Sequence, residues 1–241
     1  MKTVEELIIN SLQELRKISW ENEIKTQNSK LIFPKYCVGK HAKNPDNKRI
    51  SEQEARFLFV RELEKEENTD FYYSVETPTK RPYKDFSTKK KNPAIGDEKN
   101  GNRSGSVDVT LHKKKNGVFN RKHLIEFKFD NVDTCRKDFL KLLCDDENCE
   151  TNYYINIIKN DDKTTKERLE NTLNDLEINK YKTAVEYVFG NCEKRNEKFK
   201  SDLKIFVCIL NNIKITENNI IEYQIIDNKN QSIKEITKRI K

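Results

Sequence analysis

GSVDVTLHKKKNGVFNRKHLIEFKFD, residues 105–130, contains two stretches in which apolar and polar residues alternate. Such alternation is typical of β-strands that bury one face. Between the two stretches, Asn116 and Gly117 supply the positive φ angles that a two-residue hairpin turn needs. The segment therefore predicts a β-hairpin.

Three charged residues of this hairpin are expected to lie on one face. Asp108 belongs to the first strand, and Glu126 and Lys128 belong to the second, where side chains two residues apart point the same way. Two carboxylates beside an ammonium group are typical of a hydrolytic site that uses a divalent metal. For each residue by itself, a surface charge at a sheet edge is the alternative interpretation.

The D…ExK spacing, the apolar strands that carry it and the order of the surrounding elements resemble the PD-(D/E)XK nuclease superfamily, which has the restriction-endonuclease-like fold. The αβββαβ order of that family is matched by a helix at 51–66, a strand at 71–77, the hairpin, a helix at 133–146 and a strand at 152–159. Val107 stands where many members have proline, so Asp108 alone represents the first half of the motif.

The predicted fold class is α/β, with a mixed central sheet flanked by helices. A length of 241 residues favours a single domain. We expect an N-terminal helical extension over 1–50, the core over 51–158, and additions over 159–241. These additions are a helix near 169–181, strands at 203–210 and 220–226, and a short final helix at 232–241.

The resemblance implies a Mg²⁺-dependent nuclease that hydrolyses phosphodiester bonds, with Mn²⁺ as a substitute metal. It assigns metal binding to Asp108, Glu126 and the backbone carbonyl of Phe127, and assigns to Lys128 the orientation of water or the stabilisation of negative charge. A DNA endonuclease of a restriction or anti-phage defence system is favoured. The alternatives are an RNase, and a nucleic-acid-binding or assembly subunit of a defence complex that keeps the fold without turnover.

Further carboxylates lie on the helix and strand that precede the hairpin. Glu54 lies three residues after Ser51, which is the spacing of a helix capping box. The resemblance offers Glu54 a second role as a metal ligand. Glu62 is an alternative on the same helix, and Glu76 on the next strand is expected to face solvent.

Basic residues are concentrated in segment 79–104, which has eight Lys or Arg residues against three Asp or Glu residues. Its proline and glycine residues and its lack of periodicity predict a long loop beside Asp108. A solvated loop and a phosphate-binding loop are both consistent with this composition. The candidate nucleic-acid contacts are Lys80, Arg81, Lys89, Lys90, Lys91 and Arg103, together with Lys137 and Lys141, which should share a face of the following helix.

The overall composition gives weaker information about partners and location than these motifs do. Net charge is +7, from 47 basic and 40 acidic residues, which does not separate DNA from RNA as a partner. The six cysteines lack a CxxC pair, and neither a signal peptide nor a membrane-spanning apolar run is evident. We therefore expect a cytoplasmic protein that binds nucleic acid, with DNA favoured over RNA, and no membrane. A homodimer or a defence-system partner protein stays open.

Overall fold

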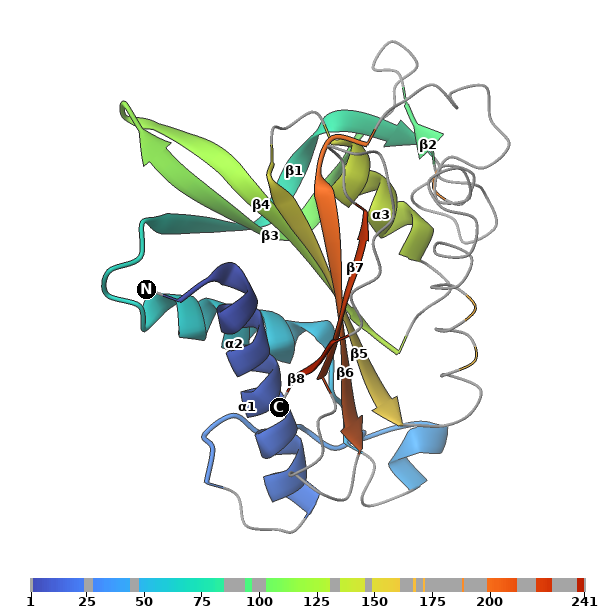
Figure 1. Ribbon diagram of the computed structural model, residues 1–241. Coiled ribbons are helices and arrows are strands. Elements are labelled where there is room, and N and C mark those ends of the chain that lie inside the picture. The colour runs from blue at the N-terminus through green and yellow to red at the C-terminus, as the bar shows by residue number, and fades with distance from the viewer. Residues whose placement is uncertain are drawn as a thin grey trace.

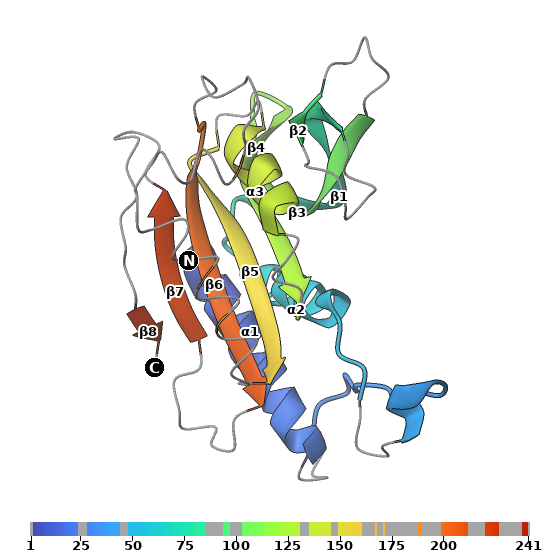
Figure 2. The same cartoon turned by 90° about the vertical axis from the view of Figure 1, so that its right-hand side faces the viewer.

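The structure is a computed structural model. It describes residues 2–23, 28–43, 48–84, 94–96, 103–130, 135–145, 149–160, 167, 171, 188, 199–211, 220–226 and 238–240. Within these residues the protein is an α/β structure in which eight strands form one mixed sheet, in the order β2-β1-β3-β4-β5-β6-β7-β8. Figures 1 and 2 show the sheet from two directions, with helices on both of its faces.

Three helices pack on the sheet. Helices α1 (Val4–Glu23) and α2 (Glu52–Glu64) contact each other and share one apolar core with the sheet, whereas α3 (Cys135–Cys144) belongs to a second core. A short 3-10 helix spans Lys40–Lys43. The opening helix α1 occupies the first half of the expected N-terminal helical extension and ends at Glu23.

The strands change from antiparallel to parallel pairing at the centre of the sheet. Antiparallel pairs join β1 to β3 and β3 to β4, parallel pairs join β4 to β5 and β5 to β6, and antiparallel pairs join the remaining strands. The strands are β1 (Phe71–Lys84), β2 (Ala94–Ile95), β3 (Arg103–Lys115), β4 (Val118–Phe129), β5 (Thr151–Asn160), β6 (Asp202–Asn211), β7 (Ile220–Ile226) and β8 (Lys238–Ile240).

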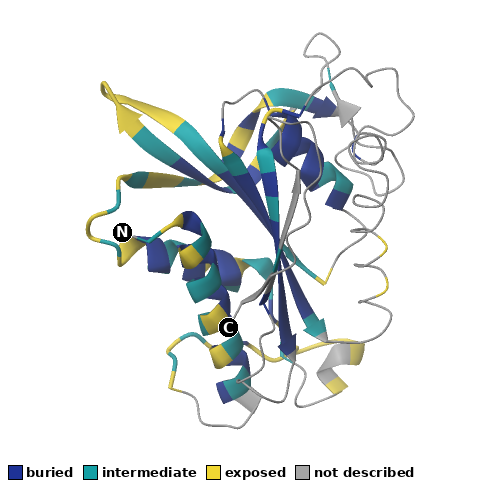
Figure 3. Cartoon of the chain, viewed as in Figure 1, coloured by how far each residue is buried: buried dark blue, intermediate teal, exposed yellow. Residues whose placement is uncertain are grey.

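Both faces of the central strands are buried, which explains why their sequences are nearly continuous apolar runs. On β4, Ile125 and Phe127 face the core of α1 and α2, while Leu124 faces the core of α3. Figure 3 shows the buried centre of the sheet and the exposed outer end of the β3–β4 hairpin. Charged residues on the inner part of these strands are therefore removed from water.

The predicted order of elements agrees with the structure. The helix α2, the strands β1, β3 and β4, the helix α3 and the strand β5 follow one another, with the two-residue strand β2 inserted before β3. The predicted hairpin turn is also confirmed, since Asn116 and Gly117 have φ angles of 51° and 79°. Ser51 and Glu54 form the predicted capping box at the start of α2.

Segment 79–104 is not one long loop, because β1 continues to Lys84 and β3 already starts at Arg103. Thr77, Thr79 and Tyr83 are buried, and they are two and four residues apart. Side chains at this spacing lie on one face of a strand. The hydroxyl of Thr79 accepts a hydrogen bond from the Gly105 amide at 2.9 Å. The register shifts between Pro78 and Pro82, an irregularity of the kind where proline is tolerated in a sheet.

The predicted final helix is also corrected, since Lys238–Ile240 form the strand β8. Its residues pair antiparallel with β7, for example Ile240 with Ile220. Backbone pairing along the open side of β7 satisfies N–H and C=O groups, and this outweighs the helical spacing of the isoleucines. The helix predicted near 169–181 lies outside the described residues apart from position 171.

Two further expectations concern the described residues only. None of their helices is long and apolar enough to cross a membrane. Five cysteines are free thiols, and all of them except Cys37 are buried.

Candidate active site

The candidate site lies where the pairing of three neighbouring strands is interrupted. The register between β1 and β3 matches Val75 with Val109 and Thr77 with Val107, and it leaves out the intervening positions Glu76 and Asp108. Glu76 has a φ of 48°, which is uncommon outside glycine and costs on the order of 1–3 kcal/mol. Backbone strain of this kind is concentrated at functional sites.

Asp108 uses both carboxylate oxygens in this gap. Its Oδ2 accepts a hydrogen bond from the Phe127 amide at 2.8 Å, and its Oδ1 lies 2.6 Å from the Arg56 guanidinium. Arg56 also reaches Glu76 at 2.5 Å, so this residue of α2 joins β1 to β3. Burial raises the pKa of Asp108, whereas the hydrogen bond from Arg56 lowers the pKa of Glu76.

Glu126 is 3% exposed and faces α3. Its carboxylate pairs with the Lys141 ammonium, which also lies 3.2 Å from Asp138 and donates to the Ser106 carbonyl at 2.8 Å. Burial raises the pKa of Glu126 well above its ordinary value. Burial alone would lower the pKa of Lys141, but the charges of Glu126 and Asp138 raise it instead. Lys141 is therefore protonated at neutral pH.

Lys128 lies at the far side of the same group. Its ammonium is 3.4 Å from Asp138 and 4.0 Å from Glu52, and the Glu52 carboxylate also accepts the Phe129 amide at 3.2 Å. Burial opposes the charge on Lys128, yet the neighbouring carboxylates, Asp138 first, raise its pKa. Lys128 is thus a fixed positive charge.

These residues form two ion-pair networks that Ser106 links, because its hydroxyl donates to Glu76 at 3.0 Å and its carbonyl accepts from Lys141. The two networks together are here called the charge cluster. It comprises Arg56, Glu76, Asp108, Glu126, Lys128, Asp138 and Lys141. Its four carboxylates exceed its three cations by one charge. One carboxylate oxygen, Oδ2 of Asp138, is buried and accepts no hydrogen bond within the described part of the chain, and the Lys128 ammonium lies 3.4 Å from it. The cluster therefore has one negative charge in excess that an additional cation could neutralise.

The donor atoms are suited in kind to a hard divalent cation. Asp108, Glu126 and the Phe127 carbonyl offer oxygen ligands, and Mg²⁺ uses one or two carboxylates and completes its shell with water. Across the residues that the structure describes, no group of three or more His, Cys, Asp or Glu side chains is placed to hold a metal ion. Arg56 and Lys141 contact the two carboxylates in this structure, so a metal would compete with them.

The structure brings Asp108, Glu126 and Lys128 into this cluster together with Glu76, which is exposed but pairs with Arg56. The two α2 carboxylates considered as metal ligands lie elsewhere. Glu54 accepts the Ser51 amide at 2.8 Å, in its capping role, and Glu62 pairs with Lys65. The α2 carboxylate beside Lys128 is Glu52, two residues before Glu54.

The predicted nucleic-acid contacts are distributed unevenly. Lys80 is exposed and Arg81 is partly exposed on β1, and Arg103 begins β3. Lys89, Lys90 and Lys91 lie outside the described residues.

The α3 lysines do not share an exposed face. Lys137 is partly buried, and burial lowers its pKa. Lys141 is 4% exposed and directed into the charge cluster, because its partners lie beneath the helix. It is therefore an internal counter-charge, which corrects its predicted role as a nucleic-acid contact on a face shared with Lys137.

Sequence reasoning missed Arg56 and Asp138. Both positions carried a signal, since each is a charged residue on a helix side that otherwise faces the core. Arg56 lies three residues before Phe59 and seven before Leu63, which are both buried. Asp138 lies three residues before Lys141, so the two side chains meet on one face of α3.

Comparisons test whether this arrangement belongs to a known group. No family model matches the sequence, and neither the curated proteins nor the solved structures give a significant match to it.

Proposed function

We propose that the protein is a metal-dependent nuclease with a restriction-endonuclease-like core. The observation that carries the proposal is the meeting of Asp108, Glu126 and Lys128 in one largely buried charge cluster, where the strand pairing is interrupted. A helix on each face of the sheet, three antiparallel strands and a crossover through α3 to the parallel strand β5 support the fold assignment.

The chemistry follows from the charges of the cluster. A phosphodiester resists attack because its anionic oxygens repel nucleophiles. When bound, Mg²⁺ neutralises that charge and lowers the pKa of coordinated water. Asp108, Glu126 and the Phe127 carbonyl would hold the ion, and the Lys128 ammonium would stabilise negative charge that develops on the phosphate.

Arg56 and Lys141 have a separate role in this proposal. They pair with Asp108 and Glu126 and neutralise them when no metal is bound. Without such partners, two carboxylates this close would repel each other.

The proposed substrate, biological role and cellular location rest on the family resemblance alone. We favour DNA over RNA, endonucleolytic cleavage, a restriction or anti-phage role and a cytoplasmic location. An adjacent methyltransferase gene would support restriction, whereas an adjacent helicase or sensor gene would support an effector role.

A second candidate is a nucleic-acid-binding or assembly subunit without turnover. One observation favours it: Glu76, Asp108, Glu126 and Asp138 each already have a cationic partner within the protein. A cluster in which each carboxylate has such a partner does not depend on a metal for its stability.

The deciding experiment is a cleavage assay with the purified full chain on plasmid, single-stranded DNA and RNA, in Mg²⁺, Mn²⁺ or EDTA. Asp108→Asn keeps an acceptor for the Phe127 amide and removes the charge, so it should abolish turnover while the protein stays folded. The control is Glu14→Gln. Glu14 of α1 pairs with Arg61 of α2 outside the charge cluster, so this variant should cleave normally. Absence of metal-dependent cleavage on every substrate would favour the second candidate.

A further inference from the structure

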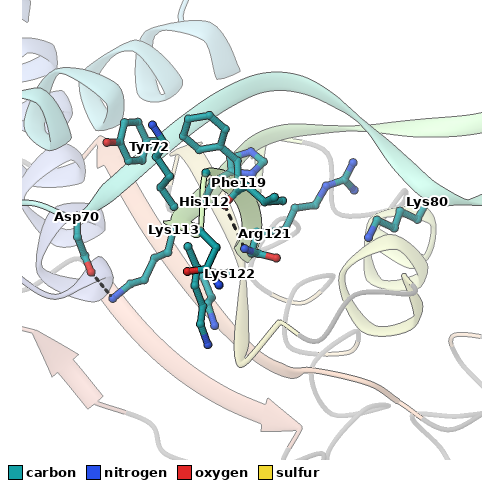
Figure 4. A pocket seen from close by; sticks show the side chains of 14 residues that line it. Asp70, Tyr72, Lys80, His112, Lys113, Phe119, Arg121 and Lys122 are labelled. Carbon is teal, nitrogen blue, oxygen red and sulfur yellow. Dashed lines mark hydrogen bonds and ion pairs between the residues drawn. The ribbon is translucent and has the colours of Figure 1, made fainter.

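The outer end of the β3–β4 hairpin forms a concave surface separate from the charge cluster. Residues 112–122, here called the hairpin arm, line it together with Asp70, Tyr72 and Lys80, around a cavity of about 1420 Å³. Figure 1 shows the arm projecting away from the helices, and Figure 4 shows the side chains that line the surface. A projecting, concave surface of this kind is accessible to a large ligand.

The surface is strongly basic. Its cationic side chains are Lys80, Lys113, Lys114, Lys115, Arg121 and Lys122. Asp70 is the one acid among the residues that line it, and it lies 2.8 Å from Lys113. Since the chain as a whole carries 40 acids against 47 bases, this is a local concentration of positive charge. Such a concentration attracts a polyanion.

Two exposed aromatic rings lie within the same surface. Tyr72 is 49% exposed and Phe119 is 51% exposed, and their ring centroids are 4.9 Å apart at 72°. The Lys114 ammonium lies 5.5 Å from the centroid of the Phe119 ring. Exposed aromatic rings beside ammonium groups are the combination that binds unpaired bases and their phosphates.

We propose that the hairpin arm binds an unpaired strand of nucleic acid, with its lysines on the phosphates and with Tyr72 and Phe119 stacked on bases. The choice of ligand rests on the proposed nuclease function, and it deepens that function by assigning single-stranded nucleic acid as the substrate class. The bases of a duplex already stack on one another, so a duplex would contact the cationic side chains and would not stack on the two aromatic rings.

The position of the arm fits this role. Lys114 is six residues from Asp108 along β3, a separation of about 20 Å. A strand several nucleotides long can therefore contact the arm and the charge cluster together. The turn at Asn116 and Gly117 has the positive φ angles of a tight hairpin, which keeps the two strands in register.

Binding is best measured by fluorescence anisotropy with the full chain in EDTA, so that turnover plays no part. The probes are labelled oligonucleotides of about 20 residues, namely oligo-dT, oligo-rU and a DNA duplex. The variant Lys114→Gln/Lys115→Gln/Lys122→Gln should weaken single-strand binding by at least about tenfold and flatten the slope of log Kd against log salt, by up to about 0.7 per lost contact. The matched control is Lys30→Gln/Lys35→Gln/Lys40→Gln, which removes the same charge from exposed lysines elsewhere and should bind like the wild type.

The aromatic rings are tested with Tyr72→Leu/Phe119→Leu. Loss of stacking should weaken oligo-dT or oligo-rU binding by about 5- to 150-fold per base and leave duplex binding unchanged. Thermal unfolding checks that each variant is folded. A preference for dT or rU identifies which nucleic acid supplies the strand.

Three results would overturn the proposal. They are equal binding by the arm variant and its control, equal loss of duplex and single-strand affinity in the aromatic variant, and tighter binding of an acidic peptide than of either oligonucleotide. Binding through the hairpin arm without cleavage would refute the proposed nuclease function but support the binding role of the arm. Cleavage by the wild type, together with normal binding by the arm variants, would refute the binding role of the arm but support the nuclease function.

Discussion

The inner and outer ends of the β3–β4 hairpin carry similar charged residues in opposite surroundings. At the inner end, Glu126 is buried and Lys128 lies within ion-pair distance of two carboxylates. At the outer end, Lys114 and Lys115 are exposed on a projecting arm. The two ends belong to the same strands and carry the same types of residue, and they differ in burial.

The difference shows how one element can serve two purposes. A buried charge has lost its hydration and depends on its partner, so removal of that partner is costly. An exposed lysine depends on no single partner, and its substitution changes stability little. Exposed charges act together instead, through the field that attracts an anionic ligand. We therefore expect inner-end substitutions to affect stability and outer-end substitutions to affect binding.

The largest stability effect is expected for Lys141→Met, because Glu126 and Asp138 lose their buried partner. The free energy of unfolding should fall by about 3–5 kcal/mol. The matched outer-end variant Lys114→Met should stay within about 0.5 kcal/mol of the wild type. Urea unfolding measures both. Similar midpoints for the two variants would mean that burial does not distinguish the ends.

A double-mutant cycle sharpens this result. Glu126→Gln and Lys141→Met should show a coupling of about 0.5–3 kcal/mol, since either substitution removes the buried ion pair between the two residues. The exposed pair Lys113 and Asp70 provides the control cycle, with Lys113→Met and Asp70→Asn, and should show at most about 1 kcal/mol. The contrast breaks down if the exposed pair is coupled as strongly as the buried one.

The pH dependence of stability should also differ in sign within the cluster. Burial raises the pKa of Glu126, so the folded protein holds its proton more tightly, and stability is lost as pH rises above about 4.3 toward the folded pKa. Glu126→Gln should therefore gain stability relative to the wild type as pH rises from about 4 to 7.

Glu76 provides the opposite case. The hydrogen bond from Arg56 lowers its pKa, so its contribution is present above about pH 4.3 and is lost as pH falls through the folded pKa. Glu76→Gln should accordingly lose stability relative to the wild type over the same rise in pH. Urea unfolding across that range checks both signs, and parallel profiles for the two variants would contradict the assigned causes.

The smallest effect is expected at the turn of the arm. Gly117 has a φ of 79° and nothing within 4 Å of an added Cβ, so Gly117→Ala costs backbone strain alone, about 1–2 kcal/mol. Thermal unfolding should show the loss, while Lys115→Ala beside the turn should be nearly neutral. An unchanged melting temperature for Gly117→Ala would indicate that the turn relaxes and that the arm is less rigid than the structure suggests.

Local sequence patterns were sufficient for much of the fold. Alternation predicted β3 and β4, the Asn-Gly pair predicted their turn, and the spacing of Ser51 and Glu54 predicted the start of α2. These features depend on neighbouring residues, so one sequence contains the necessary information. The continuation of β1 beyond Thr77 was missed because its inward position, Thr79, is polar and is buried against β3, where its hydroxyl accepts the Gly105 amide.

The candidate site was predictable only in part. The two-residue spacing placed Glu126 and Lys128 together on β4, because that geometry is local. The partners of Asp108 and Glu126 could not be read in the same way. Arg56 and Lys141 reach them only after α2 and α3 have packed on opposite faces of the sheet, and that packing depends on contacts far apart in the chain.

The two outermost strands have a consequence for the behaviour of the protein at high concentration. A sheet edge offers free N–H and C=O groups to which a strand of another molecule can add, and this is a common route to aggregation. Here the edge strands are the shortest in the sheet, with two residues in β2 and three in β8. Lys238 and Arg239 add charge to the second edge. However, β2 pairs only with Tyr83 and Lys84 of β1, so within the described residues most of the outer side of β1 has no neighbouring strand. A strand of another molecule would therefore add along β1 rather than along β2 or β8.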